Sequence, residues 1–184
     1  LPAVAGMFYP GKADPLNREL DQLLANAAPQ PRTGAVVAMI LPHAGYSYSG
    51  LTASMGYKFV SGQTFDTIVI VSPSHREHFR SISVYDGAAY RTPLGDIPVN
   101  SSLRTVLTSN DPIIEASGVG HDGEHAIEVH LPFIQKVFGA VPLLPIIMGS
   151  QRRMFCYHLA DRLASVLQGK SALARAAADR IFDL

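Results

Sequence analysis

Two continuous apolar runs constrain the fold of this chain more than any other feature. Residues 36–41 and 67–71 carry apolar and β-branched side chains without the alternation of a strand exposed on one face. Such runs are typical of strands covered on both faces, as in a parallel or mixed sheet between helices. A proline and then a histidine follow each run, ending at His43 and at His75. We therefore expect two buried strands whose ends carry a matched pair of histidines.

The segments around these runs predict helices that cover the sheet. Residues 50–60 have the small and apolar residues of a helix packed on a sheet, which makes 35–71 a predicted strand, helix, strand unit. Further helices are predicted at 101–110, 124–139 and 152–169, and further strands at 81–87 and 141–149. A chain of 184 residues suits one domain. The expected fold is a single α/β domain over 1–184, with a mixed, mostly parallel sheet and helices on both faces.

The two ends of the chain raise separate expectations. Near the start, Asp14 is the predicted N-cap of a helix, with Pro15 at its first position. Near the end, residues 170–173 begin like a strand and the following residues up to 184 read as a helix. A change from strand to helix normally needs a loop of about two to six residues. We therefore expect that a stretch is missing from the sequence between Lys170 and Arg175.

The composition excludes several classes of partner. Fifteen basic residues balance fifteen acidic ones, which removes the electrostatic argument for nucleic acid or an anionic membrane. The longest apolar runs are far shorter than the roughly 20 residues of a membrane span. A single cysteine, Cys156, fits a reducing cytoplasm, and no signal peptide is readable at the start. The expected partner is a small molecule or a protein.

His43 and His75 are the strongest candidates for chemistry. Both follow the carboxyl end of a buried strand, where open α/β sheets place their ligands. Imidazole is a common metal ligand, so two of them at one sheet edge predict most of a metal site. The expected distance between the two imidazoles is less than about 8 Å, because metal to nitrogen bonds are only about 2.1 Å long.

A third cluster lies at residues 121–130. His125, in the first turn of a predicted helix, is expected on the opposite wall of the same site, where it can act as an acid, a base or an anion contact. Asp122 and Glu124 precede it, and either one also suits a capping role at the helix start. The residues expected to contact a substrate are Tyr46, Arg91 and Asp122. Arg91 has the chemistry to hold a carboxylate or phosphate.

The segments PHAGYSYSG, VSPSH, YRTPLGD and EHAIEVHLPF, in this order and spacing, resemble the Memo family. The resemblance runs from AGMFYP near the start to about residue 149. It implies a fold similar to the class III extradiol dioxygenases, which are non-haem iron enzymes that cleave catechol rings. It also implies His43 and His75 as metal ligands, and His125 as the counterpart of the dioxygenase acid/base histidine.

The resemblance also bears on partners and on the third ligand. Bacterial relatives look like the middle component, protein B, of a system that also encodes a radical-SAM protein and an AMMECR1-like protein, so these two are candidate partners. Members of the family continue with a motif resembling Ser-Ser-Asp-X-Ser/Cys-His-Tyr, which supplies a third metal ligand in some of them. Nothing after Lys170 matches that motif, so the sequence leaves the third ligand unidentified.

Two functions follow from these residues. The first is a metal-dependent oxidoreductase of the dioxygenase-like type, with iron as the expected divalent metal, copper or zinc as alternatives, and an unknown substrate. The second is a non-catalytic binding module, in which the same histidines attract a phosphate or carboxylate of a peptide or partner protein. Metal content and the response to phosphate separate the two.

Overall fold

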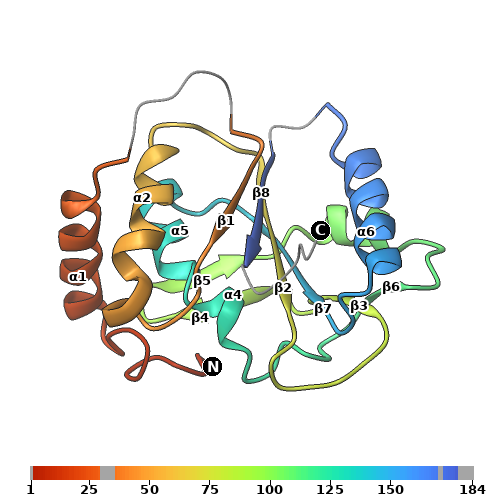
Figure 1. The fold of residues 1–184 in the computed structure, drawn as a ribbon, viewed down its shortest axis with the longest axis horizontal. Helices are drawn as coiled ribbons and strands as arrows, with labels where there is room; N and C mark the ends of the chain where they lie inside the picture. The colour runs from red at the N-terminus through yellow and green to blue at the C-terminus, as the bar shows by residue number, and fades with distance from the viewer. Residues whose placement is uncertain (1, 30–35, 170–171, 178–184) are drawn as a thin grey trace.

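Six strands form one mixed sheet within residues 2–29, 36–169 and 172–177, the parts of the chain that the computed structural model describes (Figure 1). Their order is β1-β8-β2-β7-β3-β6, and every pairing is parallel except that of β3 with β7. The strands are β1 (Ala38–Leu41), β2 (Thr67–Pro73), β3 (Ile82–Val84), β6 (Ile114–Ala116), β7 (Leu143–Met148) and β8 (Ala172–Ala177). A separate antiparallel hairpin pairs β4 (Ala89–Thr92) with β5 (Gly95–Pro98).

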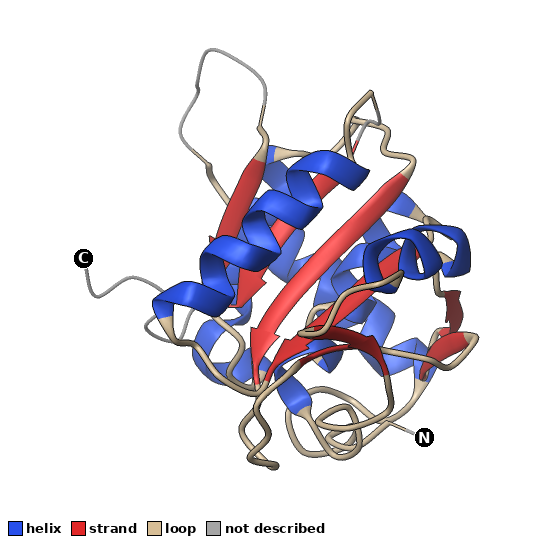
Figure 2. Cartoon of the chain, turned by 90° about the vertical axis from the view of Figure 1, so that its right-hand side faces the viewer, coloured by secondary structure: helices blue, strands red, loops and turns tan. Residues whose placement is uncertain are grey.

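Helices cover both faces of this sheet, as predicted, and Figure 2 shows one of them lying across the strands. The helical elements are α1 (Ala13–Asn26), the π-helical turn η1 (Tyr46–Gly50), α2 (Leu51–Phe59), α3 (Ser101–Thr108), α4 (His125–Glu128), α5 (Leu131–Phe138) and α6 (Arg153–Val166). Helices α1, α2 and α5 contact one another, and α3 contacts α6. Within the described residues, no helix is long and apolar enough to cross a bilayer.

Strand β2 lies between two hydrophobic cores. Ile68 and Ile70 belong to the core that contains residues of α1, α2 and α5. Val69, which points to the opposite face, belongs to the core that contains residues of α3 and α6. The prediction that 67–71 forms a strand covered on both faces is therefore confirmed.

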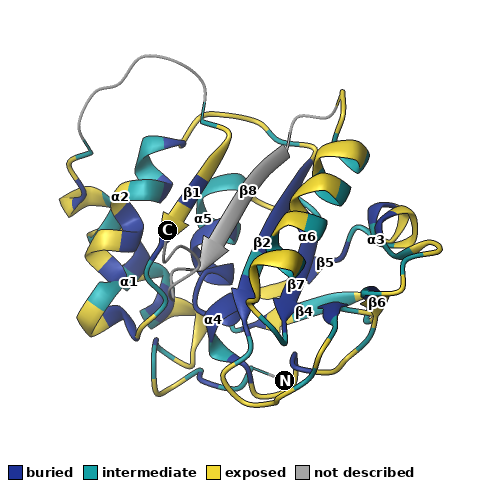
Figure 3. Ribbon diagram, turned by 45° about the vertical axis from the view of Figure 1, so that its right-hand side comes forward, coloured by how far each residue is buried: buried dark blue, intermediate teal, exposed yellow. Residues whose placement is uncertain are grey.

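The same prediction is wrong for the first apolar run. Its strand is β1, at the edge of the sheet, and its side chains alternate between exposed and buried, with Ile40 56% exposed (Figure 3). The predicted unit of β1, α2 and β2 is present, but β8 lies between its two strands. An apolar run indicates strand propensity, whereas its burial depends on neighbours that are remote in sequence.

The helix predicted over 124–139 is divided into α4 and α5. Pro132 explains the division, because it has no N–H to donate to the carbonyl of Glu128 four residues earlier. It lies at the second position of α5, where a helix tolerates proline. The interruption leaves His125 at the start of a helix of only four residues.

Both predictions for the chain ends need correction. Helix α1 begins at Ala13 with Lys12 as its N-cap, so Asp14 lies in the first turn and is not the cap. Residues 174–177 continue strand β8, where a helix was predicted. This strand pairs with β1 on one side and β2 on the other, and these long-range bonds override local helix propensity. The rest of that predicted helix lies outside the described residues, and the proposed gap after Lys170 stays a prediction.

Candidate metal centre

His43 lies on the loop between β1 and α2. Pro42 ends the strand, and the chain turns through η1 directly after the loop. Gly45 allows a close approach here, because a Cβ atom at this position would lie 3.3 Å from the carbonyl oxygen of Phe8. The same oxygen accepts a hydrogen bond of 2.7 Å from the N–H of Tyr46. A π-helical turn is a frequent feature of functional sites, and this one follows His43 by three residues.

A buried carboxylate fixes His75, which follows β2. One oxygen of Glu124 accepts from the His75 backbone N–H at 2.7 Å, and the other lies 2.9 Å from His75 Nδ1. The second oxygen also accepts from the N–H groups of His125 and Ala126, which makes Glu124 the N-cap of α4. Burial alone would raise the pKa of Glu124, but these hydrogen bonds and the His75 ring outweigh it and lower the pKa. Glu124 is therefore ionised near neutral pH.

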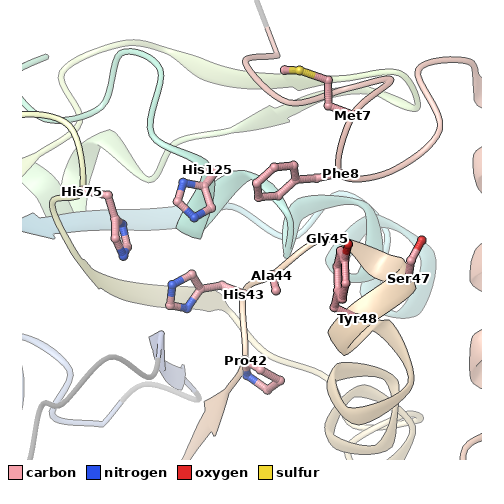
Figure 4. A pocket seen from close by; sticks show the side chains of 10 residues that line it. All are labelled: Met7, Phe8, Pro42, His43, Ala44, Gly45, Ser47, Tyr48, His75 and His125. Carbon is pink, nitrogen blue, oxygen red and sulfur yellow. The ribbon is translucent and has the colours of Figure 1, made fainter.

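The three histidine rings surround one space, as Figure 4 shows. The ring centroids of His43 and His75 lie 5.1 Å apart, which confirms the expected proximity of the pair. His125 lies 5.6 Å from His43 and 4.8 Å from His75 by the same measure. One nitrogen from each ring lies within 4.8 Å of the other two. His125 therefore joins the pair as a third possible donor.

The histidines lie at one end of a cavity of about 620 Å³. Its walls come from the N-terminal segment, the loop after β1, the loop after β2 and the start of α4 (Figure 4). Besides the histidines, the lining residues are Met7, Phe8, Pro42, Ala44, Gly45, Ser47 and Tyr48. Met7 and Tyr48 are 73% and 90% exposed, so the mouth of the cavity carries large apolar side chains in contact with solvent.

A second buried carboxylate, Glu128, anchors the N-terminal wall. It accepts hydrogen bonds from Ala3 N–H at 2.6 Å, from Val4 N–H at 3.0 Å and from the Tyr9 hydroxyl at 2.6 Å. The anchored segment carries Phe8, whose ring packs edge-on against His125 with centroids 5.2 Å apart. The short helix α4 thus contains both His125 and the carboxylate that holds the wall beside it.

The structure does not bring the three predicted substrate contacts into the lining of this cavity. Tyr46 is buried, and its hydroxyl donates to the carbonyl of Val129 at 2.9 Å. Arg91 is on the β4–β5 hairpin, where its guanidinium forms a two-fold hydrogen bond with Asp96 at 2.7 and 2.9 Å. Asp122 is exposed on the loop before α4. Their roles as substrate contacts stay predictions.

Comparisons with known proteins identify the same family that the sequence motifs on these loops predicted. Residues 1–180 match the family of Memo-like proteins. The chain belongs to the Memo family. It is 34% identical over 176 residues to a MEMO1 family protein of Thermotoga maritima, covering 90% of this chain and 64% of the relative.

Two other relatives bear the same family name. A protein of Thermoplasma acidophilum is 36% identical over 153 residues, which cover 82% of this chain and 56% of the relative. A protein of Pyrobaculum aerophilum is 33% identical over 187 residues, which cover 97% and 66%. This Memo-family chain therefore spans 56–66% of the length of these relatives. Its single α/β domain, with a mixed and mostly parallel sheet, is consistent with the dioxygenase-like Memo fold.

Sequence reasoning missed several residues that line or support this Memo-family pocket. Glu124 was expected at most as a helix cap, and its contact with His75 joins residues 49 positions apart. Met7 and Phe8 precede the first helix without any periodic pattern and gave no sign of lining a site. Glu128 had only its four-residue spacing from Glu124 as a signal, and that spacing does not reveal the N-terminal donors.

A further buried histidine, His121, supports the loop before α4. Its Nδ1 lies 2.6 Å from the hydroxyl of Tyr90, and its Nε2 lies 3.3 Å from the carbonyl oxygen of Ser83. Because a carbonyl only accepts, Nε2 carries the hydrogen and Nδ1 accepts from Tyr90. Burial lowers the pKa of His121 to about 4, so the ring is neutral at pH 7.

This histidine predicts a loss of stability in acid. A neutral His121 stabilises the fold above the ordinary histidine pKa, and that stabilisation disappears as pH falls from about 6.5 to about 4. We expect a loss of about 3 kcal/mol in the free energy of unfolding across this interval. Urea unfolding of the wild type and of His121→Gln at pH 7, 5.5 and 4.5 measures it. Equal pH slopes for the two proteins would contradict the assignment.

Proposed function

We propose that this Memo-family domain binds a divalent metal through His43, His75 and His125, as the centre of a dioxygenase-like oxidoreductase. The observation that carries the proposal is the convergence of three imidazole nitrogens within 4.8 Å at the end of an open cavity. Neutral imidazole suits iron, copper and zinc, and three such ligands leave positions for small molecules. Iron is the metal we propose, on the similarity of the Memo fold to the non-haem iron dioxygenases.

The donor set fits a cation of this size. Nitrogens bonded to one tetrahedral ion at about 2.1 Å lie about 3.4 Å apart, so binding would draw the ring nitrogens together by up to roughly 1.5 Å. Such a shift is within reach of side-chain rotation. The ionised Glu124 adds a negative charge directly behind His75, at 2.9 Å from its Nδ1. This charge favours a cation at the centre.

In the proposed reaction, the bound metal and the residues that line the cavity have different roles. A bound iron would supply coordination of small ligands and electron transfer with dioxygen. Phe8 packs on His125 and limits the access of water to that ring. Met7 and Tyr48 at the mouth offer apolar contacts to an organic substrate.

There are two alternative roles for His125, and the variant His125→Ala distinguishes them. As third ligand, it contributes to metal affinity as much as His43 does. As the proton donor or acceptor that the resemblance implies, it contributes to turnover but little to affinity. We propose the ligand role, because one nitrogen of His125 lies within 4.8 Å of a nitrogen of each member of the pair. An affinity of His125→Ala equal to that of the wild type would assign the proton-transfer role.

The proposal is tested by anaerobic titration of metal-free, untagged protein with Fe(II), Co(II) and Zn(II). We expect one ion per chain. The Fe(II)-loaded protein is then supplied with a panel of catechols, and oxygen uptake is measured. Binding without uptake would retain the metal centre and remove the oxidoreductase activity. No binding of any of the three metals would remove both.

Metal affinity is expected to depend on pH, because protons compete for the same nitrogens. Histidine side chains ordinarily gain a proton near pH 6.5, so protonation at pH 5.5 weakens each of the three proposed ligands about tenfold and lowers the affinity by roughly 1,000-fold relative to pH 8. Co(II) titrations at these two values measure the change. An affinity that stays constant over the interval would indicate carboxylate ligands elsewhere.

The binding module remains the competing function, and Glu124 is the observation that weighs against it. A buried carboxylate at the centre repels a phosphate or carboxylate ligand. A thermal shift produced by phosphate or phosphotyrosine, and not by divalent metals, would favour the module.

On the family resemblance alone, we also propose the cytoplasm as location, and AMMECR1-like and radical-SAM proteins as partners.

A further inference from the structure

We propose that Glu124 is a positioning residue of the histidine centre, which directs the Nε2 atom of His75 toward the metal. This inference rests on the proposed metal function and deepens it. Its basis is the set of contacts that one carboxylate makes with two of the three histidines.

The carboxylate holds His75 at two points. Oxygen Oε2 accepts from the backbone N–H at 2.7 Å, and oxygen Oε1 lies 2.9 Å from Nδ1 of the same residue. A ring fixed at both its backbone and its Nδ1 atom has little freedom to rotate. The side chain of Glu124 is only 1% exposed, so water does not compete for these bonds.

The contact also determines the tautomer of His75. Backbone N–H groups donate to both oxygens of Glu124, two of them to the Oε1 atom that faces the ring, so this oxygen is an acceptor and Nδ1 of His75 carries the hydrogen. In a neutral imidazole the other nitrogen, Nε2, then has the lone pair that a metal requires. Metal-bound histidines commonly donate their second nitrogen to a carboxylate, and loss of that partner typically lowers metal affinity 10–100-fold.

Glu124 connects His75 to His125 as well. The same Oε1 accepts from the backbone N–H of His125 at 2.9 Å and lies 3.3 Å from its ring atom Nδ1. One carboxylate therefore sets the position of the loop after β2 relative to the start of α4. The distance between two of the three donor rings depends on it.

Glutamine at position 124 has nearly the size of glutamate but should break the set of hydrogen bonds that holds His75. The two carboxylate oxygens face donors on both sides, the His75 N–H on one and the His75 ring with two helix N–H groups on the other. Glutamine has one oxygen, so its amide N–H₂ must face a donor on one side. The His75 ring then either rotates or changes its tautomer.

Asp111 provides a matched control. Its carboxylate accepts from the N–H groups of Ile113 and Ile114, both at 2.9 Å, and lies 2.8 Å from Nε2 of His158. The side chain is 3% exposed. Like Glu124, it is a buried carboxylate that holds backbone amides and a histidine ring, here with Arg162 Nε 3.1 Å away in addition, at residues that do not line the cavity. Asp111→Asn should lower stability and leave metal affinity unchanged.

The test compares Glu124→Gln, Asp111→Asn and the wild type in Co(II) titrations. We expect Glu124→Gln to bind Co(II) 10–100-fold more weakly, with altered visible absorption bands of the bound ion, and Asp111→Asn to match the wild type in both. Equal affinity and an unchanged spectrum in Glu124→Gln would overturn the inference and reduce Glu124 to a helix cap.

A second measurement needs neither metal nor variant. Nitrogen-15 NMR of the metal-free wild type assigns the tautomer of His75, for which we expect hydrogen on Nδ1. Hydrogen on Nε2 would overturn the inference even if metal binds. If the wild type bound no metal while His75 showed hydrogen on Nδ1, the proposed function would fail and the positioning of the ring by Glu124 would stand.

Discussion

Replacing both His43 and His75 with alanine is expected to lower the affinity for Fe(II) or Co(II) by at least about 100-fold. The two rings supply two of the three nitrogens that lie within 4.8 Å of one another, and His125 alone cannot chelate an ion. Because a ligand that binds only the folded state raises its stability, the wild type should show a metal-dependent increase in melting temperature. The double variant should show none.

His78→Ala is the control for this experiment. His78 is an exposed histidine three residues after His75, and it does not line the cavity. We expect it to leave both the stoichiometry and the thermal shift unchanged. If the double variant kept the metal content of the wild type, the metal would be bound at surface sites and the proposed centre would be wrong.

The pair of histidines was predictable because it depends on a rule of sheet geometry. Parallel strands end at the same edge, so residues that follow β1 and β2 come together whichever strand lies between them. His43 and His75 are therefore neighbours in space although β8 separates their strands. The location of β8 was not predictable, because its alanines favour a helix locally and only the pairing on both sides makes them a strand.

The supporting residues of the site were beyond the sequence for a different reason. Glu124, Glu128 and Phe8 act through contacts with partners 38 to 125 positions away, and no local spacing encodes such pairs. Carboxylates at a helix start have an ordinary explanation as caps, and Glu124 does cap α4. The second role of Glu124, the positioning of His75, is visible only in the three-dimensional structure. There the loop that carries His75 donates to the same carboxylate oxygens.

Replacing Glu128 with alanine should strongly destabilise the domain. The substitution leaves three donors without their acceptor, namely the N–H groups of Ala3 and Val4 and the hydroxyl of Tyr9. Burial and the adjacent carboxylate raise the pKa of Tyr9, so this hydroxyl stays protonated and remains a donor. An unsatisfied buried donor costs about 1–3 kcal/mol, and partial entry of water reduces the sum. We expect a loss of about 3 kcal/mol in the free energy of unfolding.

Tyr9→Phe measures how much one of the three donors to Glu128 contributes to the free energy of unfolding. It removes the hydroxyl but keeps the ring, which packs against Tyr46 with centroids 5.6 Å apart, so the expected loss is about 1 kcal/mol. Urea unfolding gives both values.

Because the N-terminal segment carries Phe8, Glu128→Ala should also expose His125 and make residues 2–9 sensitive to protease in the folded protein. An unfolding midpoint within error of the wild type would mean that Glu128 does not anchor this wall, and Phe8 would then need another explanation for its contact with His125.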